Sequence, residues 1–171
     1  MRKQNQNSSP IPWIIACLLT TTLLNYPQTA NSSPAAKPET VVFVCEHGSA
    51  KSVIVAAHFN LLAAEKGLPY RAIACGSNPD EKIPAIVADG LAGNGLTVSG
   101  GQPTRVSVED VQKAVRTVTL ATALPHSIPV APAKLTKWND LPAVSENYAA
   151  AREAIVRHVT ELLVQLAAQS R

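Results

Sequence analysis

The sequence predicts an α/β domain in which helices cover both faces of a four-stranded, mostly parallel sheet. Short runs of β-branched and aromatic residues alternate along the chain with longer segments rich in alanine and leucine. The first run, TVVFVC at 40–45, is continuous, which is typical of a strand covered on both faces. Because strands that alternate with helices favour parallel pairing with right-handed crossovers, we expect a single doubly wound domain.

The first half of the domain is expected to supply two strands and two helices. After the first strand, residues 49–66 predict a helix that stops at Gly67. YRAIAC at 70–75 predicts the second strand, and the turn-rich segment GSNPDEKIP follows it. Residues 84–95 predict a second helix, which their glycines weaken.

The second half is expected to complete the sheet and to end in a long helix. A serine followed by acidic residues predicts a helix start in 107–114, and VRTVTLAT at 115–122 predicts the third strand. Prolines flank a short fourth strand candidate at 127–131. The final helix is predicted from Ser145, which can cap it, to residue 169, because its apolar residues fall largely on one stripe.

The N-terminus has the three regions of a signal peptide. Two basic residues, Arg2 and Lys3, precede an apolar core at 11–24, and a polar region of small residues follows it. Ala30 and Ser32 have the spacing of a cleavage site. The apolar core is short for a membrane span, so export to the periplasm or the cell exterior is expected.

The chain is therefore divided into a signal peptide at 1–32, a flexible lead-in at 33–39 and one domain at 40–171. After cleavage no stable membrane span is expected. Two alternatives are an uncleaved membrane anchor and a lipoprotein lipidated at Cys17, although the apolar run continues past that cysteine.

Composition limits the classes of partner. Apolar residues make up 46% of the chain and charged residues 16%, which indicates a globular rather than a disordered protein. The net charge is +3 without a basic block, so a nucleic-acid partner is not implied. His58 and His158 lack neighbours of metal-ligand type, and neither a metal nor another cofactor is expected.

The segment after the first strand combines a nucleophile with an anion site. Gly48 can adopt positive φ angles, so successive amides can turn inward as an anion nest. The helix that begins near Lys51 adds its N-terminal N–H groups and dipole. The same positive potential should favour the thiolate of Cys45, and Ser52 can hydrogen-bond its sulfur. The predicted phosphate-binding residues are Glu46, His47, Gly48, Ser49, Ala50, Lys51 and Ser52.

This segment resembles the active-site loop of the low-molecular-weight protein tyrosine phosphatase superfamily, which includes the thioredoxin-coupled arsenate reductases. The family pattern is C-x5-R-S, and the reductase branch often shows C-x-H-N-x-x-R-S. Cys45, His47 and Ser52 match that pattern, while Gly48 stands where asparagine is usual. The resemblance implies a phosphotyrosine phosphatase I-like fold and a phosphate- or arsenate-like oxyanion, or a phosphorylated substrate, as ligand.

Three further stretches carry the same resemblance along the domain. AIACGSNPD resembles the family's S-A-G-T region, with Cys75 at the serine place. Residues 95–122 resemble the family stretch that contains L-T-x-E-D, and KWNDLP at 137–142 resembles the end of the reductase branch.

Two departures from the family concern the chemistry. Lys51 replaces an arginine whose planar fork holds two oxygens of a phosphoryl group, and a lysine supplies only a point charge. The family's general acid lies in a D-P pair, which this chain lacks. Asp140 lies in the corresponding region and is the candidate acid; the alternative is an aspartate that caps or solvates a turn.

Cys75 leaves three interpretations open: a resolving thiol, a redox switch for Cys45, or a packed cysteine. Adjacent strands would bring the two cysteines within disulfide distance. The predicted function is a phosphatase that acts through a Cys45 thiophosphate and uses Lys51 and Asp140. The alternative is an arsenate reductase-like, thiol redox or anion-binding module with little turnover, for which a thiol reductant is a further partner.

Overall fold

The computed structural model describes residues 37–98 and 101–169. All of the described residues belong to one compact unit within residues 34–171. The predicted signal peptide at 1–32 and most of the lead-in that follows lie outside the described residues. None of the helices in the described part of the chain has the length and apolar character that a membrane span requires.

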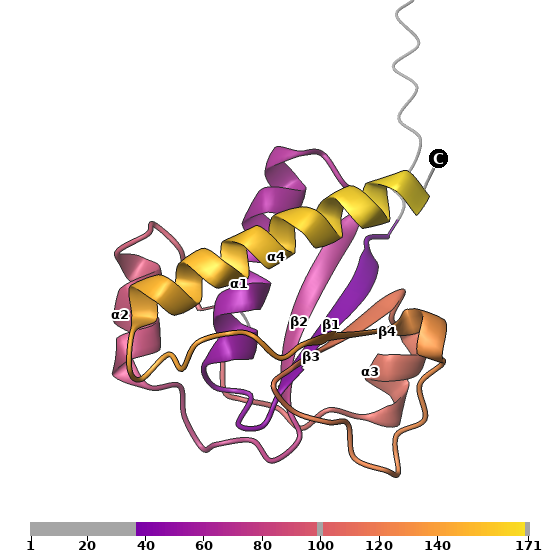
Figure 1. The fold of residues 1–171 in the computed structure, drawn as a ribbon, viewed down its shortest axis with the longest axis horizontal. Helices are drawn as coiled ribbons and strands as arrows, with labels where there is room; N and C mark the ends of the chain where they lie inside the picture. The colour runs from indigo at the N-terminus through magenta and orange to yellow at the C-terminus, as the bar shows by residue number, and fades with distance from the viewer. Residues whose placement is uncertain (1–36, 99–100, 170–171) are drawn as a thin grey trace, which may run out of the picture. The chain divides into compact units, whose positions relative to one another are not determined.

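A four-stranded sheet forms the centre of the domain (Figure 1). Its strands are β1 (Glu39–Cys45), β2 (Tyr70–Gly76), β3 (Arg116–Leu120) and β4 (Leu135–Trp138). They lie in the order β2-β1-β3-β4, and all three pairings are parallel. The order reverses direction at β1, which confirms the predicted doubly wound architecture.

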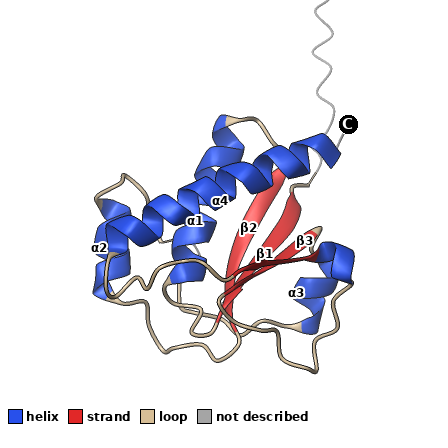
Figure 2. Cartoon of the chain, viewed as in Figure 1, coloured by secondary structure: helices blue, strands red, loops and turns tan. Residues whose placement is uncertain are grey.

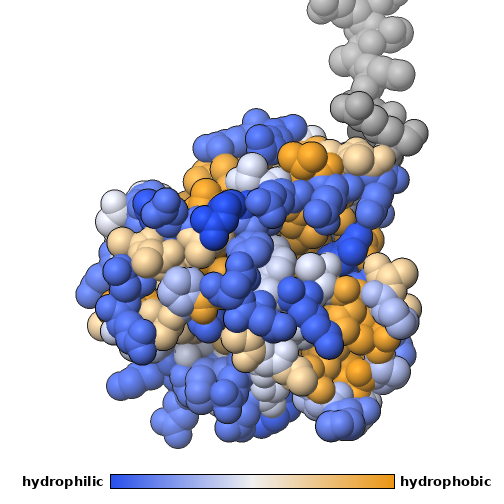
Figure 3. Space-filling model, viewed as in Figure 1, coloured by the Kyte–Doolittle hydropathy of each residue, from blue (hydrophilic) through white to orange (hydrophobic). Residues whose placement is uncertain are grey.

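Helices cover both faces of the sheet (Figure 2). The helices are α1 (Lys51–Glu65), α2 (Ala85–Ala92), α3 (Val108–Lys113) and α4 (Tyr148–Gln169), with a short 3-10 helix at Pro132–Lys134. α1, α2 and α4 form one layer, in which α4 crosses α1, and α3 packs on the opposite face. The outer side of α4 is largely hydrophilic in Figure 3, as expected for a helix that buries one stripe.

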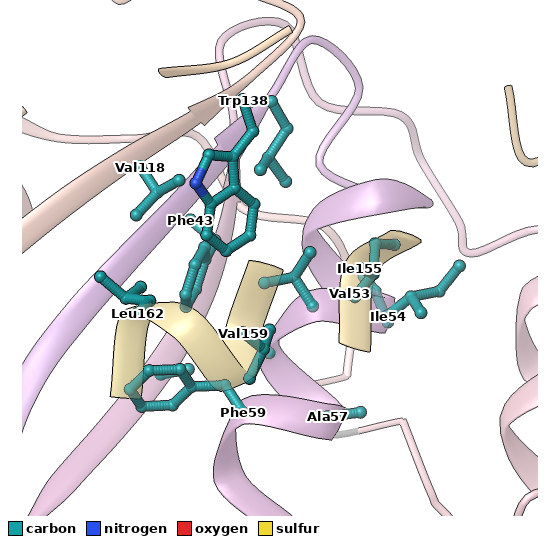
Figure 4. Packing of buried hydrophobic residues seen from close by; sticks show 14 of the residues in the cluster. Phe43, Val53, Ile54, Ala57, Phe59, Val118, Trp138, Ile155, Val159 and Leu162 are labelled. Carbon is teal, nitrogen blue, oxygen red and sulfur yellow. The ribbon is translucent and has the colours of Figure 1, made fainter. Parts of the chain in front are cut away.

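The larger hydrophobic core lies between the sheet and α1, α2 and α4. Phe43 of β1 lies near its centre, with its ring centroid 5.4 Å from that of Phe59 and 5.7 Å from that of Trp138 (Figure 4). Ile155 and Val159 of α4 are fully buried against the same cluster. Because alternate residues of a strand face opposite sides, the neighbours of Phe43 belong to a second, smaller core that α3 covers.

Side-chain caps mark the starts of α3 and α4. Ser107 caps α3 as predicted: its Oγ accepts from the N–H of Asp110, whose carboxylate accepts from the N–H of Ser107. The prediction that Ser145 caps the last helix is wrong. Asn147 does so, because its Oδ1 accepts from the N–H of Ala150 at 3.0 Å.

The predicted fourth strand at 127–131 is also wrong, and the strand is β4 instead. Pro129 has no N–H to donate, so its segment cannot complete a parallel ladder. LTKW at 135–138 contains no proline and pairs with β3 from Thr117↔Leu135 to Leu120↔Trp138. Ile128 is nevertheless buried in the smaller core, which accounts for the apolar character that suggested a strand.

Candidate active site

Cys45 is the last residue of β1, and only 6% of its surface is exposed. The backbone N–H of Gly48 donates a hydrogen bond to Cys45 Sγ at 3.1 Å, and Ser52 Oγ lies 3.3 Å from the same sulfur. The Gly48 N–H is a fixed donor to the sulfur, whereas the Ser52 hydroxyl can act as donor or acceptor in its contact. Cys45 is a free cysteine, so the sulfur is available for chemistry.

Backbone hydrogen bonds from the segment that follows β2 hold the loop between β1 and α1 in place. The N–H groups of Ser77, Asn78 and Asp80 donate to the carbonyl oxygens of residues 45, 46 and 47 at 2.8–3.0 Å. In a trans peptide the C=O and the next N–H point in opposite directions. The N–H groups of residues 46–48 therefore point away from this segment, as an anion nest requires.

The N-terminus of α1 completes the loop. The helix begins at Lys51, as predicted, and Ala50 at its N-cap supplies no side-chain cap. The first N–H groups of a helix lack intrahelical acceptors, so they and the helix dipole favour an anion at this end. Gly48 has a φ of +63°, which is the left-handed conformation that the sequence predicted for it.

A cavity of about 360 Å³ opens over this loop. Its polar residues come mainly from the loop and the segment after β2: Cys45, Glu46, His47, Ser49, Lys51 and Asp80. Small and aliphatic residues from α2, the end of β3 and the segment before α4 form much of the remaining wall. A larger cavity of about 630 Å³ is lined by β2 and residues 101–104, but Cys45 does not line it, so we assign the chemistry to the smaller one.

Most of the predicted site residues come together here. Glu46, His47, Ser49, Ala50 and Lys51 line the cavity with Cys45. Gly48 and Ser52 do not line it, and both contact the sulfur directly. Within the described residues, no group of three or more His, Cys, Asp or Glu side chains is arranged to hold a metal ion.

Asp140, the predicted general acid, does not line the cavity. Both of its carboxylate oxygens lie 3.0 Å from Nε2 of His158, whose ring stacks on Trp138 with centroids 4.8 Å apart. The hydrogen bond from His158 lowers the pKa of Asp140 below its ordinary value and so favours the carboxylate. In this arrangement Asp140 ties the segment before α4 to α4 itself.

Asp80 is a cavity residue that sequence reasoning missed. Its Oδ2 accepts a hydrogen bond from Ser49 Oγ at 2.5 Å, and its Oδ1 lies 3.2 Å from Nδ1 of His47. The available signal was its position a few residues after β2, because the carboxyl ends of parallel strands meet at one edge of the sheet.

Cys75 does not meet Cys45 across the sheet. It pairs in register with Val44, and both residues belong to the smaller core, whereas Cys45 belongs to the larger one. Both cysteines are free. Burial, followed by the charge of Asp110, raises the pKa of Cys75 to about 11. Adjacency of the strands was predicted correctly, but alternation puts the thiols on opposite faces, which supports the packed cysteine among the three interpretations.

A buried cysteine at the carboxyl end of a parallel strand, under an anion loop and a helix N-terminus, is the arrangement of a cysteine-dependent oxyanion site. No protein-family model matches this chain, and neither does any curated protein. Solved structures do match it with high probability.

Three of these structures identify the fold of the domain. YfkJ from Bacillus subtilis superposes with a TM-score of 0.69 at 19% identity, over 78% of this chain and 98% of that chain. An arsenate reductase from Archaeoglobus fulgidus gives a TM-score of 0.58 at 25% identity, over 71% and 97%. A low-molecular-weight protein tyrosine phosphatase from T. tengcongensis gives 0.64 at 18% identity, over 74% and 99%. The domain therefore has the fold of the low-molecular-weight phosphatase and arsenate reductase superfamily.

Proposed function

We propose that this protein is a cysteine-dependent phosphatase that hydrolyses phosphate monoesters through a Cys45 thiophosphate. The observation that carries the proposal is the environment of the sulfur. Cys45 Sγ accepts a hydrogen bond from the Gly48 N–H and contacts Ser52 Oγ. The cysteine lines a cavity in which the N–H groups of the loop are suited to bind an oxyanion. The likeness to phosphatase structures supports the same reaction class.

The first step would be attack of the Cys45 thiolate on phosphorus. The loop N–H groups and the first turn of α1 would hold the equatorial oxygens as charge develops on them. Water would then attack the thiophosphate and release inorganic phosphate, with the sulfur as leaving group. Ser52, at 3.3 Å, would stabilise the departing thiolate by its hydroxyl.

Lys51 sets the expected rate. It lies at the first position of α1 and lines the cavity, where its ammonium can approach the bound oxyanion. An ammonium cannot reproduce the two parallel hydrogen bonds of a guanidinium. Loss of one such transition-state contact commonly costs about 2.7–4 kcal/mol, or about a hundredfold or more in rate, so we expect slow turnover.

A module that binds oxyanions with little turnover is the second candidate. Lys51 favours it, because a point charge supports binding better than it supports transition-state geometry. The likeness to an arsenate reductase at 25% identity makes an arsenate-like oxyanion a suitable ligand for that candidate. The placement of Cys75 in the opposite core gives no support to a Cys45–Cys75 redox couple.

Hydrolysis of p-nitrophenyl phosphate under reducing conditions tests the proposal. We expect slow release of p-nitrophenol by the wild type, none by Cys45→Ser, and faster release by Lys51→Arg. Release that survives in Cys45→Ser would exclude the cysteine mechanism. No wild-type activity, together with activity in Lys51→Arg, would favour the binding module instead. Titration of Cys45→Ser with phosphate and arsenate measures oxyanion binding separately from turnover.

A further inference from the structure

We infer that His47, oriented by Asp80, is the catalytic acid that protonates the leaving group. This inference rests on the proposed phosphatase function and goes beyond it by assigning the proton donor. The two residues face each other in the wall of the cavity that contains Cys45, with His47 Nδ1 3.2 Å from Asp80 Oδ1.

Asp80 is well placed to fix the imidazole. Its N–H donates to the carbonyl of His47 at 3.0 Å, so the two residues are joined through the backbone as well as through their side chains. Its second carboxylate oxygen accepts from Ser49 Oγ of the anion loop at 2.5 Å. An acidic residue that engages one ring nitrogen of a histidine leaves the other nitrogen for proton transfer.

The second ring nitrogen of His47, Nε2, belongs to a side chain that lines the cavity and is 56% exposed. Nε2 of His47 is 3.9 Å from Glu46 Oε2, a long contact between two half-exposed side chains at the rim. Cys45, by contrast, is 6% exposed and lies at the base of the site. Because attack and departure are in line across phosphorus, the leaving oxygen points away from the sulfur and towards the cavity mouth.

Asp140 is less suited than His47 to protonate the leaving group. It is absent from the cavity lining, and both of its oxygens are engaged by His158. The His47 imidazole has a second ring nitrogen besides the one that faces Asp80, so it can give a proton in one step and take one up in the next.

The proton balance closes over the two steps. In the first, the S–P bond forms, the P–O bond to the leaving group breaks, and the proton on His47 Nε2 moves to the leaving oxygen. In the second, water adds its oxygen to phosphorus and its proton to Nε2, while the S–P bond breaks and returns the Cys45 thiolate. Nδ1 stays paired with Asp80 throughout.

Leaving-group dependence tests the assignment. p-Nitrophenolate departs readily without a proton, whereas phenolate and benzyl alcoholate need one, and general acid catalysis is commonly worth about 10²–10⁴ in rate. We expect His47→Asn, which keeps a nitrogen near Asp80, to lose about a hundredfold or more on phenyl and benzyl phosphate and far less on p-nitrophenyl phosphate. Asp80→Asn should show the same selectivity at smaller amplitude.

Asp140→Asn tests the alternative proton donor. This variant should keep the wild-type ratio of rates between the substrates. A selective loss in Asp140→Asn, or an equal loss on all substrates in His47→Asn, would overturn the assignment. Iodoacetate labelling of Cys45 in each variant reports whether the loop is intact. Absence of turnover by the wild type on every substrate would overturn the proposed function itself, whereas turnover with unselective losses would overturn only the role of His47.

Discussion

Gly48 and Gly76 pack backbone against backbone at the carboxyl end of the sheet. A Cβ placed on either residue would lie 2.7 Å from the backbone nitrogen of the other, closer than real Cβ contacts come. Gly48 belongs to the anion loop, and Gly76 is the last residue of β2. This contact therefore sets how closely the loop approaches the strand next to Cys45, and it explains why both positions need glycine.

The glycine pair predicts separable effects of adding a methyl group. Gly76→Ala should cost about 1–3 kcal/mol through overpacking alone. Gly48→Ala should cost more, because it adds left-handed strain, about 1–2 kcal/mol, to the same close contact. Both variants should lose phosphate binding as the loop moves away from Cys45. Urea unfolding and phosphate titration measure the two effects.

Gly67 provides the matched control for strain. Its φ of +62° equals that of Gly48 within a degree, yet a Cβ there meets nothing within 4 Å. Gly67→Ala should therefore show the strain cost without loss of phosphate binding. If Gly76→Ala were as stable as the wild type, the close approach would not constrain the loop.

How well each feature could be predicted from the sequence depends on whether neighbouring residues in the chain form it. The strand end, the left-handed glycine and the helix start around Cys45 could be predicted because they are contiguous in 41–52. The fourth strand could not, because LTKW is an edge strand with one exposed lysine and little apolar signal. A proline-flanked apolar segment was mistaken for it.

The proton donor depended on tertiary contacts. Asp80 and Asp140 both follow the ends of strands, and nothing in their local sequence distinguishes the one that reaches the cavity. Asp140 is instead paired with His158, a helix residue that lies 18 residues further along the chain. Such pairings have no periodic signature in a single sequence.

Cys75 predicts a loss of stability at alkaline pH. Its folded pKa is raised from 9.0 to about 11, so the folded state keeps a proton that the unfolded state loses. The stabilisation is fully present below pH 9 and disappears as the pH rises towards 11. By linkage it amounts to at most about 2–3 kcal/mol. Unfolding free energies of Cys45→Ala and Cys45→Ala/Cys75→Ala across this range measure it as a difference that shrinks with pH.

A difference between these two variants that is constant from pH 8 to 11 would contradict the prediction. The shared Cys45→Ala background removes the other described thiol, and lysine and tyrosine titrations are common to both proteins. Thiol labelling gives an independent check: Cys75 should react only on global unfolding, whereas Cys45 should react in the folded protein.

The Asp140–His158 pair predicts a small acid-sensitive contribution to stability. The pKa of Asp140 is lowered from 3.8, chiefly by the hydrogen bond from His158, so the stabilisation is present above about pH 4 and is lost as the pH falls further. The carboxylate is exposed, so Asp140→Asn should lower the melting temperature only slightly at pH 7. Wild type and Asp140→Asn should approach each other in melting temperature as the pH falls below about 4. Divergence at low pH would contradict the assigned direction.

The hydrogen bonds of Asn60 predict that this side chain protects the edge of the sheet at β2. β2 is an edge strand, and Asn60 of α1 acts as its partner at Ala72: Oδ1 accepts from the Ala72 N–H at 2.7 Å, and Nδ2 donates to its carbonyl at 3.3 Å. Asn60→Ala removes both bonds and should cost about 1–3 kcal/mol, because two backbone groups lose their partners. It should also promote association through the opened edge.

Asn60→Asp separates the two bonds. The carboxylate keeps the acceptor for the Ala72 N–H but faces the Ala72 carbonyl without a donor, so it should be destabilising while its charge opposes edge pairing. Urea unfolding measures the stability of both variants, and light scattering against protein concentration measures their association. Equal association of the two variants would show that the lost stability, rather than the opened edge of β2, drives it.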